Sequence, residues 1–337
     1  MPNFDAIIIG TGQSGPALAR RLVAAGRKVA IIERKFFGGT CVNTGCTPTK
    51  TLIASAHAAH VARRAADYGV RVEGSVNVDM KAVKARKDAV VAAFHNGVER
   101  SLRTLQGCTV YQGHGHFVAE KKVAVNDSEL AADHIFLNVG GRATIPPIPG
   151  LDQVPYLTNS SMMDIDFLPT HLVILGGSYV GLEFAQMYRR FGSEVTVIEL
   201  GPRLISREDA DVSQAVADFL KDEGINVRVD SKVVGAEKQG NSIAVKVESG
   251  GGRSQMLLER TCWSRPVGGR TRTTLGSTGP ASSPTRTAIS RWTTSCTPTS
   301  QASGRWATAM AEARSRTRRG MISRSWRPTF STTIRGA

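Results

Sequence analysis

Two stretches of the chain repeat one hydrophobic pattern, in which a short apolar run is followed by a glycine-rich turn and a helical period. Residues 4–9 and 170–175 are the apolar runs. Such runs before a helix are typical of buried parallel strands, so the pattern predicts an α/β protein. Further strands are expected at 28–32, 108–111, 117–120, 122–125, 134–139, 194–198, 225–229, 233–238 and 242–248, and helices at 18–25, 51–64, 80–105, 183–191 and 209–223.

The first turn carries a GxGxxG pattern and is followed, one strand later, by an acid. Gly10 allows the tight turn, Gly12 lets the backbone approach a pyrophosphate, and Gly15 allows close helix–strand packing. The helix N-terminus then faces the phosphates, and Glu33 accepts from a ribose hydroxyl. The pattern therefore predicts a dinucleotide site, with a ligand-free glycine turn as the alternative.

The second turn repeats the first less strictly. Its residues are Gly176, Gly177, Ser178, Tyr179, Val180 and Gly181, followed by Glu199 at the tip of the next strand. Ser178 replaces the middle glycine, which makes this site weaker. Two such units predict two Rossmann-like three-layer domains and two cofactors. Glu199 favours the free 2′-hydroxyl of NAD, whereas Arg203 and Arg207 leave NADP open.

A cysteine pair lies directly after the first unit, in GGTCVNTGCTPTK. Cys41 and Cys46 are candidates for two buried thiols, half of a zinc site, or a redox pair. A zinc site needs about four ligands, and no second Cys/His cluster stands nearby. Thiols at a helix N-terminus usually have a lowered pKa and exchange readily. Lys50 adds a positive charge that stabilises an anionic flavin or thiolate.

This thirteen-residue segment resembles the active-site signature of the class I pyridine nucleotide–disulfide oxidoreductases. Its residues are most similar to those of the mercuric-reductase-like members. The resemblance covers residues 3 to about 250. It implies FAD and NAD(P)H as cofactors. It also implies that Cys41 is the interchange thiol, that Cys46 contacts the flavin as the charge-transfer thiolate, and that Lys50 lies near flavin N5. Tyr179 would gate the nicotinamide pocket and Glu183 would pair with Lys50, the alternatives being an ordinary aromatic and a surface acid.

Two more segments carry the resemblance. Residues 113–117 are similar to the stretch whose backbone approaches the adenine of FAD, and 139–150 to the family's hinge, with Asn138 where Ala or Thr is usual. The implied catalytic residues are Cys41, Cys46, Lys50, Tyr179 and Glu183. The implied cofactor-binding residues are Gly10, Gly12, Ser14, Gly15, Glu33, Gly39, Thr40, Lys50, Gly115, Val139, Gly140, Gly176, Gly177, Ser178, Tyr179, Val180, Gly181 and Glu199.

No metal site is expected. His57 and His60 lie at helical spacing but have no acidic or cysteine partners, so packing or exposed histidines are the interpretation. Lone Cys108 is interpreted as a core residue. No apolar run reaches the roughly 18 residues of a membrane helix, and no secretory signal is recognised. We therefore expect a cytoplasmic protein with no membrane partner.

The charge is concentrated at one end. Of the formal +15, residues 261–337 carry 13 Arg against one Glu, which leaves +3 for the first 260 residues. That segment has no Lys or Asp, contains all four Trp and shows no sustained period. A basic nucleic-acid-binding arm is one interpretation. The absence of Lys argues against it, so no nucleic-acid partner is expected.

A lost reading frame is the other interpretation. With one shift of frame, residues 302–311 can encode IWALGDCNG, which is similar to the family's second FAD motif. Residues 261–280 can encode DVLVAAGRGPNTDDLGLDRAG, and 321–335 can encode DDFEIVAANLLDDDPR. Three matches in one frame and in family order support a frame lost between about 247 and 260. Sequencing the gene decides this hypothesis, because codons that cannot spell these alternatives would contradict it.

The sequence thus predicts an FAD-binding domain over 1–150, an NAD(P)-binding domain over 151–258, and an anomalous, disordered or poorly folded tail over 259–337. The expected enzyme passes electrons from NAD(P)H through flavin to the Cys41–Cys46 disulfide and on to a disulfide or metal ion (EC 1.8 or 1.16). The alternatives are an inactive frame-shifted remnant and a flavoprotein without the disulfide step. The resemblance implies a homodimer whose interface domain, which supplies the partner's His–Glu base, is missing here.

Overall fold

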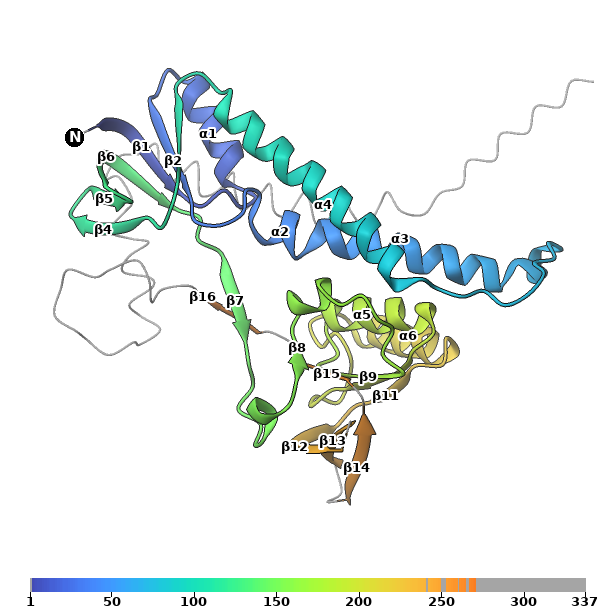
Figure 1. Cartoon of the computed structure of the whole chain (residues 1–337). Helices are drawn as coiled ribbons and strands as arrows, with labels where there is room; N and C mark the ends of the chain where they lie inside the picture. The colour runs from blue at the N-terminus through green and yellow to red at the C-terminus, as the bar shows by residue number, and fades with distance from the viewer. Residues whose placement is uncertain (1, 241, 250–252, 260, 265–266, 271–337) are drawn as a thin grey trace, which may run out of the picture. The chain divides into compact units, whose positions relative to one another are not determined.

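The computed structural model describes residues 2–240, 242–249, 253–259, 261–264 and 267–270, the last three ranges by their backbone alone. The predicted tail beyond residue 270, and the frame-shift hypothesis built on it, lie outside the described residues. Figure 1 shows the order of the elements along the chain.

The first sheet has six strands in the order β3-β2-β1-β6-β5-β4. Strands β1 (Asn3–Ile9), β2 (Val29–Glu33), β3 (Cys108–Gln112) and β6 (Ser128–Leu137) are parallel, and β5 (Lys122–Val125) and β4 (His116–Ala119) extend the sheet antiparallel. The crossovers run through helices α1 (Gly15–Ala24), α2 (Gly39–Asn43), α3 (Cys46–Arg63) and α4 (Met80–Arg103). The order 3-2-1-4 of the parallel strands is that of a dinucleotide-binding half.

Alternation along β1 explains how this sheet is buried on both faces. Ile8 belongs to a core with Ala19 of α1 and Leu102 of α4. Ile7 and Ile9 point the other way and pack with residues of β5 and β6. All three isoleucines are 5% exposed or less, which explains why the run reads as continuously apolar.

The second sheet repeats the arrangement in the order β11-β10-β9-β15-β8, with every pairing parallel. Its strands are β9 (His171–Leu175), β10 (Glu194–Ile198), β11 (Asn226–Arg228), β8 (Tyr156–Leu157) and β15 (Thr261–Ser264). Helices α5 (Tyr179–Phe191) and α6 (Ala210–Asp222) contribute to one core cluster of this sheet. A second core cluster joins this sheet to a meander of three strands, β12 (Ser231–Gln239), β13 (Ser242–Ser249) and β14 (Arg253–Glu259).

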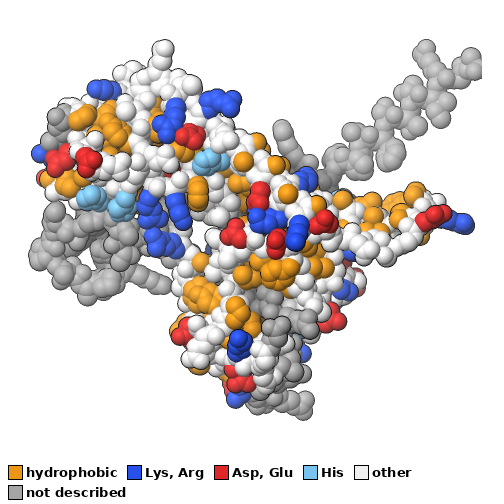
Figure 2. Space-filling view, viewed as in Figure 1, with side chains coloured by type: hydrophobic (Ala, Val, Ile, Leu, Met, Phe, Trp, Pro, Cys, Tyr) orange, Lys and Arg blue, Asp and Glu red, His pale blue; other side chains and the backbone are white. Residues whose placement is uncertain are grey.

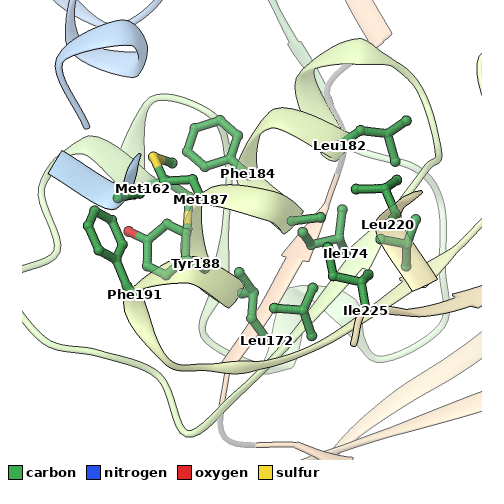
Figure 3. Close-up of a cluster of buried hydrophobic side chains, with 14 of the residues drawn as sticks. Met162, Leu172, Ile174, Leu182, Phe184, Met187, Tyr188, Phe191, Leu220 and Ile225 are labelled. Atoms are coloured by element: carbon green, nitrogen blue, oxygen red, sulfur yellow. The ribbon is translucent and has the colours of Figure 1, made fainter. Parts of the chain in front are cut away.

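The largest buried hydrophobic cluster of the described residues lies between this sheet and its helices. Figure 3 shows Leu172 and Ile174 of β9 packed against Phe184, Met187 and Tyr188 of α5, with Leu220 of α6 nearby. Leu52 and Ala56 of α3 and Met80 of α4 complete the same cluster. Helices α3 and α4, which belong to the first half of the chain, therefore supply part of the core of the second half.

The expected α/β architecture with two Rossmann-like units is confirmed. The sequence analysis assigned no element after residue 250, whereas the backbone forms β14, β15 and β16 (Val267–Arg270). β16 pairs antiparallel with β7 (Gly141–Thr144) in the segment predicted as a hinge. These strands are defined by pairing with distant segments, which local periodicity does not report. The remaining short elements are 3₁₀ turns at Ala65–Tyr68, Leu151–Gln153 and Ser161–Met163.

The described residues contain no helix that is long and apolar enough to cross a membrane. On the face in Figure 2, Lys and Arg side chains are interspersed with Asp and Glu. This distribution agrees with the small net charge of the first 260 residues.

Candidate active site

The first glycine turn lies between β1 and α1, where the carboxyl end of β1 meets β6. Gly10 has a φ of +105°, and a Cβ there would lie 2.2 Å from the carbonyl oxygen of Asn138. A Cβ at Gly15 would lie 2.4 Å from the carbonyl oxygen of Gly10. Both positions therefore need glycine, for the conformational and packing reasons the sequence predicts.

Glu33 closes the turn from the neighbouring strand. One carboxylate oxygen accepts from the amide of Thr11 at 3.0 Å and from its hydroxyl at 2.5 Å, and the other accepts from the amide of Lys35 at 2.9 Å. The carboxylate is nearly buried, and these bonds satisfy it. Contact between Glu33 and a ribose stays a prediction. Thr11 was not among the predicted residues, although its place between two fingerprint glycines marks it.

The second turn is closed in the same way. Gly177 donates its amide to Glu199 at 2.6 Å, and Gly201 donates to the other oxygen of the same carboxylate at 2.9 Å. Gly176 donates to the carbonyl of Ile198 at 2.8 Å, as Gly10 donates to that of Ile32 at 2.7 Å. Ser178 is the residue before α5, with extended backbone and no side-chain cap. The repeat inferred from sequence therefore extends to matched hydrogen bonds.

The cysteine pair spans two helices. Cys41 lies in the short helix α2, and Cys46 is the first residue of α3. Asn43 donates its side-chain amide to the carbonyls of Phe37 and Gly39, both at 2.9 Å, which fixes the loop that precedes Cys41. Gly39 has a φ of +61°, and a Cβ there would lie 2.8 Å from Cα of Gly12. The cysteine loop thus packs directly on the first nucleotide turn.

Both cysteines are thiols in this structure, Cys41 half-buried and Cys46 exposed. Burial first, and then a hydrogen bond with Cys46 and the charge of Cys46, together raise the pKa of the Cys41 thiol to about 11. The backbone of Cys46 opposes this effect by a hydrogen bond that lowers the pKa. The general expectation of a lowered pKa therefore does not hold for Cys41, because burial and the neighbouring Cys46 disfavour a negative charge on it.

A cavity of about 430 Å³ brings the first turn and the cysteines together. Of the predicted residues it is lined by Gly10, Gly12, Glu33, Gly39, Thr40, Cys41, Cys46, Gly115, Val139 and Gly140. Gln13, Arg34, His114 and Asn138 line it as well and were not predicted as contacts. Arg34 follows the predicted acid and His114 precedes Gly115, so their places beside predicted residues could have identified them as contacts.

The glycines that line the cavity suit the close approach of a pyrophosphate. A Cβ at Gly12 would meet the Asn138 side chain at 3.3 Å, and one at Gly39 would meet the turn itself. The backbone is therefore bare of side chains where a phosphate has to approach closely. The remaining predicted residues, among them Ser14, Gly15, Lys50 and those of the second turn, are not among its lining residues.

Two polar contacts occur at the start of α5. Lys50 of α3 forms a salt bridge with Glu183, with side-chain exposures of 63% and 36%. The predicted pair is therefore brought together. Tyr179 donates its hydroxyl to Glu208, a partner that the sequence analysis did not name. Among the described residues, no group of three His, Cys, Asp or Glu side chains is arranged to hold a metal ion.

A model of one protein family, described as pyridine nucleotide-disulphide oxidoreductase, matches residues 4–278. The chain belongs to this family. The family uses FAD and NAD(P)H, which confirms the two cofactors expected from the two turns.

Among its relatives, a mercuric reductase from Bacillus cereus is 35% identical over 74% of this chain and 39% of its own length. A dihydrolipoyl dehydrogenase from Acholeplasma laidlawii is 34% identical over 68% of this chain and 69% of its own length. A Cu(II) complex of the flavoprotein disulfide reductase RclA from Escherichia coli superposes with a TM-score of 0.71 at 30% identity, covering 82% of this chain and 59% of that chain. The chain thus spans about half the length of most of these family members.

Proposed function

We propose that the chain is the nucleotide-binding part of a flavin-dependent oxidoreductase that passes electrons from a pyridine nucleotide to Cys41 and Cys46, and from them to a substrate disulfide or a thiol-bound metal ion. One observation carries the proposal. The two cysteines line the same cavity as the first glycine turn, so a dinucleotide held by that turn lies against them.

The chain's own residues define the thiol steps. Bound FAD would supply the two-electron link between the nicotinamide and the cysteine disulfide. The disulfide takes up two electrons and two protons and becomes the thiols of Cys41 and Cys46. Cys41, as thiolate, attacks a substrate disulfide and releases one substrate thiol, and Cys46 then attacks the mixed disulfide, releases the second thiol and restores the bond. In sum, NAD(P)H, a proton and one disulfide give NAD(P)⁺ and two thiols.

Cys41, which is proposed as the attacking thiol, is the less exposed of the two cysteines. Burial and the neighbouring Cys46 raise the pKa of Cys41, so the proton must be removed by a base before Cys41 attacks. The resemblance implies that in family homodimers this base is a His–Glu pair of the interface domain. Without that pair, a buffer base or a hydroxide ion has to remove the proton.

The test is NADH-dependent reduction of the small disulfide DTNB by the full chain loaded with FAD. We expect Cys41→Ser to abolish turnover, and Cys108→Ser, a half-buried cysteine outside the cavity, to leave it unchanged. Turnover that survives Cys41→Ser would favour a flavoprotein without the disulfide step. Purified chain that binds no FAD would favour an inactive remnant.

The substrate is proposed as a class. Paired thiolates bind soft metal ions and exchange with disulfides. The relatives named above include a mercuric reductase, a dihydrolipoyl dehydrogenase and a disulfide reductase studied with Cu(II). Turnover with DTNB, lipoamide and mercuric ion in parallel would separate these classes, because Cys41→Ser should abolish each true activity.

The coenzyme is proposed to be NADH. Glu199 accepts from Gly177 of the second turn with one carboxylate oxygen and from Gly201 with the other. Its negative charge is therefore at the strand tip, where the adenosine ribose of the coenzyme would bind. Arg203 donates to the carbonyl of Ser206 at 3.2 Å, within its own loop. We expect NADH to bind at least roughly tenfold more tightly than NADPH, measured by the fluorescence of the bound nicotinamide. Equal affinity would contradict the assignment.

A further inference from the structure

A histidine of α4 reaches the loop that carries the cysteine pair. Helix α4 runs beside the short helix α2 (Figure 1). Nδ1 of His95 on α4 lies 3.3 Å from the side-chain oxygen of Asn43, the last residue of α2. The His95 ring also meets the rings of Phe36 and Phe37 edge-on, with ring centroids 6.1 and 6.0 Å away. This histidine has no part in the thiol steps described above.

The partners of Asn43 fix the direction of its bond with His95. The side-chain nitrogen of Asn43 donates to the carbonyls of Phe37 and Gly39, each at 2.9 Å. Turning the amide over would place its oxygen against two carbonyl oxygens, so the nitrogen faces them. The amide oxygen that faces His95 can only accept, and Nδ1 of His95 therefore carries the proton that it donates. The other ring nitrogen, Nε2, lies 3.9 Å from Oε2 of Glu99, beyond hydrogen-bond distance.

The three bonds of Asn43 hold α2 at the place where the two thiols meet. Asn43 stands between Cys41 and Cys46 in the chain, and its bonds join the segment before α2 to α4. The thiols of the two cysteines are hydrogen-bonded to each other. Two groups held in contact react far more readily than the same groups on a freely moving loop, because the entropy of bringing them together has already been lost.

We propose that His95 is a positioning residue for the cysteine pair: it donates to Asn43, fixes α2 and keeps the thiol of Cys41 beside that of Cys46, which favours the disulfide over the dithiol. The inference rests on the proposed function, in which these cysteines exchange electrons. Without His95 the dithiol loop would gain freedom that closing the disulfide has to remove again. The disulfide restrains the loop by itself, so only the dithiol gains that freedom and the equilibrium moves towards it.

The experiment equilibrates the full chain with reduced and oxidised glutathione and measures the free thiols of Cys41 and Cys46 by maleimide labelling and mass spectrometry. In the reaction measured, two glutathione thiols are oxidised to glutathione disulfide while the Cys41–Cys46 bond is reduced to two thiols. For His95→Ala we expect the equilibrium constant for closing the disulfide to fall roughly fivefold, the effect of one lost hydrogen bond. His57→Ala, at an exposed histidine of α3 whose ring stacks on His60, is the control and should leave the constant unchanged.

Two polar substitutions separate the hydrogen bond from the bulk of the side chain. An asparagine at position 95 can place an N–H where Nδ1 stands, whereas a glutamine places its amide where Nε2 stands. His95→Asn should therefore keep the constant within about twofold of the unmodified chain, and His95→Gln should match His95→Ala. In the Asn43→Ala background His95→Ala should have no further effect, because both substitutions remove the same bond.

A purely structural role predicts a different result. It would lower the melting temperature of His95→Ala equally in the disulfide and dithiol forms and leave the equilibrium constant unchanged. That finding overturns the proposal, as would equal constants for His95→Asn and His95→Gln, or a further fall when His95→Ala is added to Asn43→Ala. If His95→Ala does not fold, the comparison of the asparagine and glutamine variants decides.

The same titration distinguishes failure of this inference from failure of the proposed function. A disulfide whose equilibrium does not respond to position 95 would overturn the inference alone. An unmodified chain in which Cys41 and Cys46 form no disulfide at any glutathione ratio would overturn the proposed function and the inference together.

Discussion

Cys41 illustrates how a residue's surroundings, and not its motif, set its reactivity. With a pKa of about 11, on the order of one Cys41 in ten thousand is a thiolate at pH 7. Partial burial and the adjacent Cys46 thiol cause this, since both disfavour a negative charge on Cys41. In the reduced chain without flavin, Cys41 should therefore be a slow nucleophile at neutral pH.

Alkylation by iodoacetamide, followed by peptide mass spectrometry, tests this. The rate at Cys41 should remain low at pH 8 and rise towards pH 11. Cys46→Ala removes a hydrogen bond and a charge that raise the pKa, so the rise should move to lower pH, by roughly one unit. Cys108 is the internal control, because burial alone raises its pKa to about 11 and the substitution should leave its profile unchanged.

The second prediction concerns the stability lost when Gly39, which packs on the first turn, is replaced by alanine. Gly39 and Gly140 both have positive φ, +61° and +66°, so alanine at either position costs about 1 kcal/mol in backbone strain. A Cβ at Gly39 also meets Cα of Gly12, whereas one at Gly140 meets nothing within 4 Å. Gly39→Ala should therefore lower the free energy of unfolding in urea by about 2 kcal/mol more than Gly140→Ala. Equal losses would show that the cysteine loop moves away without cost.

The sequence predicted the roles of single residues unevenly. Gly10, Glu33 and Cys41 were singled out because a nucleotide turn and a redox pair need a residue type at a fixed spacing from a strand, and their roles stay predictions. The Lys50–Glu183 contact followed from resemblance alone, since 133 positions separate its members. Asn138 was noted only as a departure from the Ala or Thr that is usual in the family. Its partners Gly10 and Ser14 belong to the first glycine turn, more than 100 positions away, and no local pattern predicts such a contact.

At the scale of elements, α5 and α6 are joined by a carboxylate at the end of α6. Arg190 of α5 binds Glu223 through two bonds of 2.8 and 2.6 Å, and Gln186 adds a third at 2.8 Å. The charged side chains are 17% and 20% exposed. Burial alone would raise the pKa of Glu223, but the bonds from Arg190 and Gln186 and the charge of Arg190 outweigh it and hold the pKa below its ordinary value.

The pH dependence follows from that direction. Because the folded pKa of Glu223 is depressed, the stabilisation is fully present above the unfolded value, near pH 4.3, and is lost as pH falls through the folded pKa. Glu223→Gln should lower the free energy of unfolding by about 2 kcal/mol at pH 7, and the difference from the unmodified chain should shrink below about pH 4. Urea unfolding at several pH values measures both. Lys121 also lowers the pKa of Asp133, but this pair is exposed, so Asp133→Asn should change the free energy of unfolding little at any of these pH values.

Helices with a helical period sustained over many residues, and strands with a continuous apolar run, were predicted with ends within a few residues of those observed. Helix α3 begins five residues before the predicted start, because Cys46 to Lys50 form its first turn and their mixed residue types hide the period. The short strands β7 and β8 were missed. Each exists through pairing with residues more than 100 positions away, so neither has a pattern of its own.

For the whole molecule, the second core depends on helices from the first half. Leu52 of α3 is 4% exposed and packs in the cluster that contains Leu172 and Val195 of the second sheet. Leu52→Ala should cost about 3 kcal/mol and speed amide hydrogen exchange in β9 and β10. Leu102→Ala, buried in the first core, should speed exchange in β1 and β2 instead. Exchange confined to α3 in Leu52→Ala would contradict the shared core.

The matched carboxylate bonds of the two turns bear on how this chain could be recombined. In each unit an acid 22 positions after a turn residue accepts that residue's amide, Glu33 from Thr11 and Glu199 from Gly177. Because the donor is a backbone amide and the acceptor a glutamate at the same spacing in both units, a chimera that exchanged only a turn should keep this bond. A redesign of coenzyme choice that replaces Glu199, in contrast, must also supply a new acceptor for the amide of Gly177.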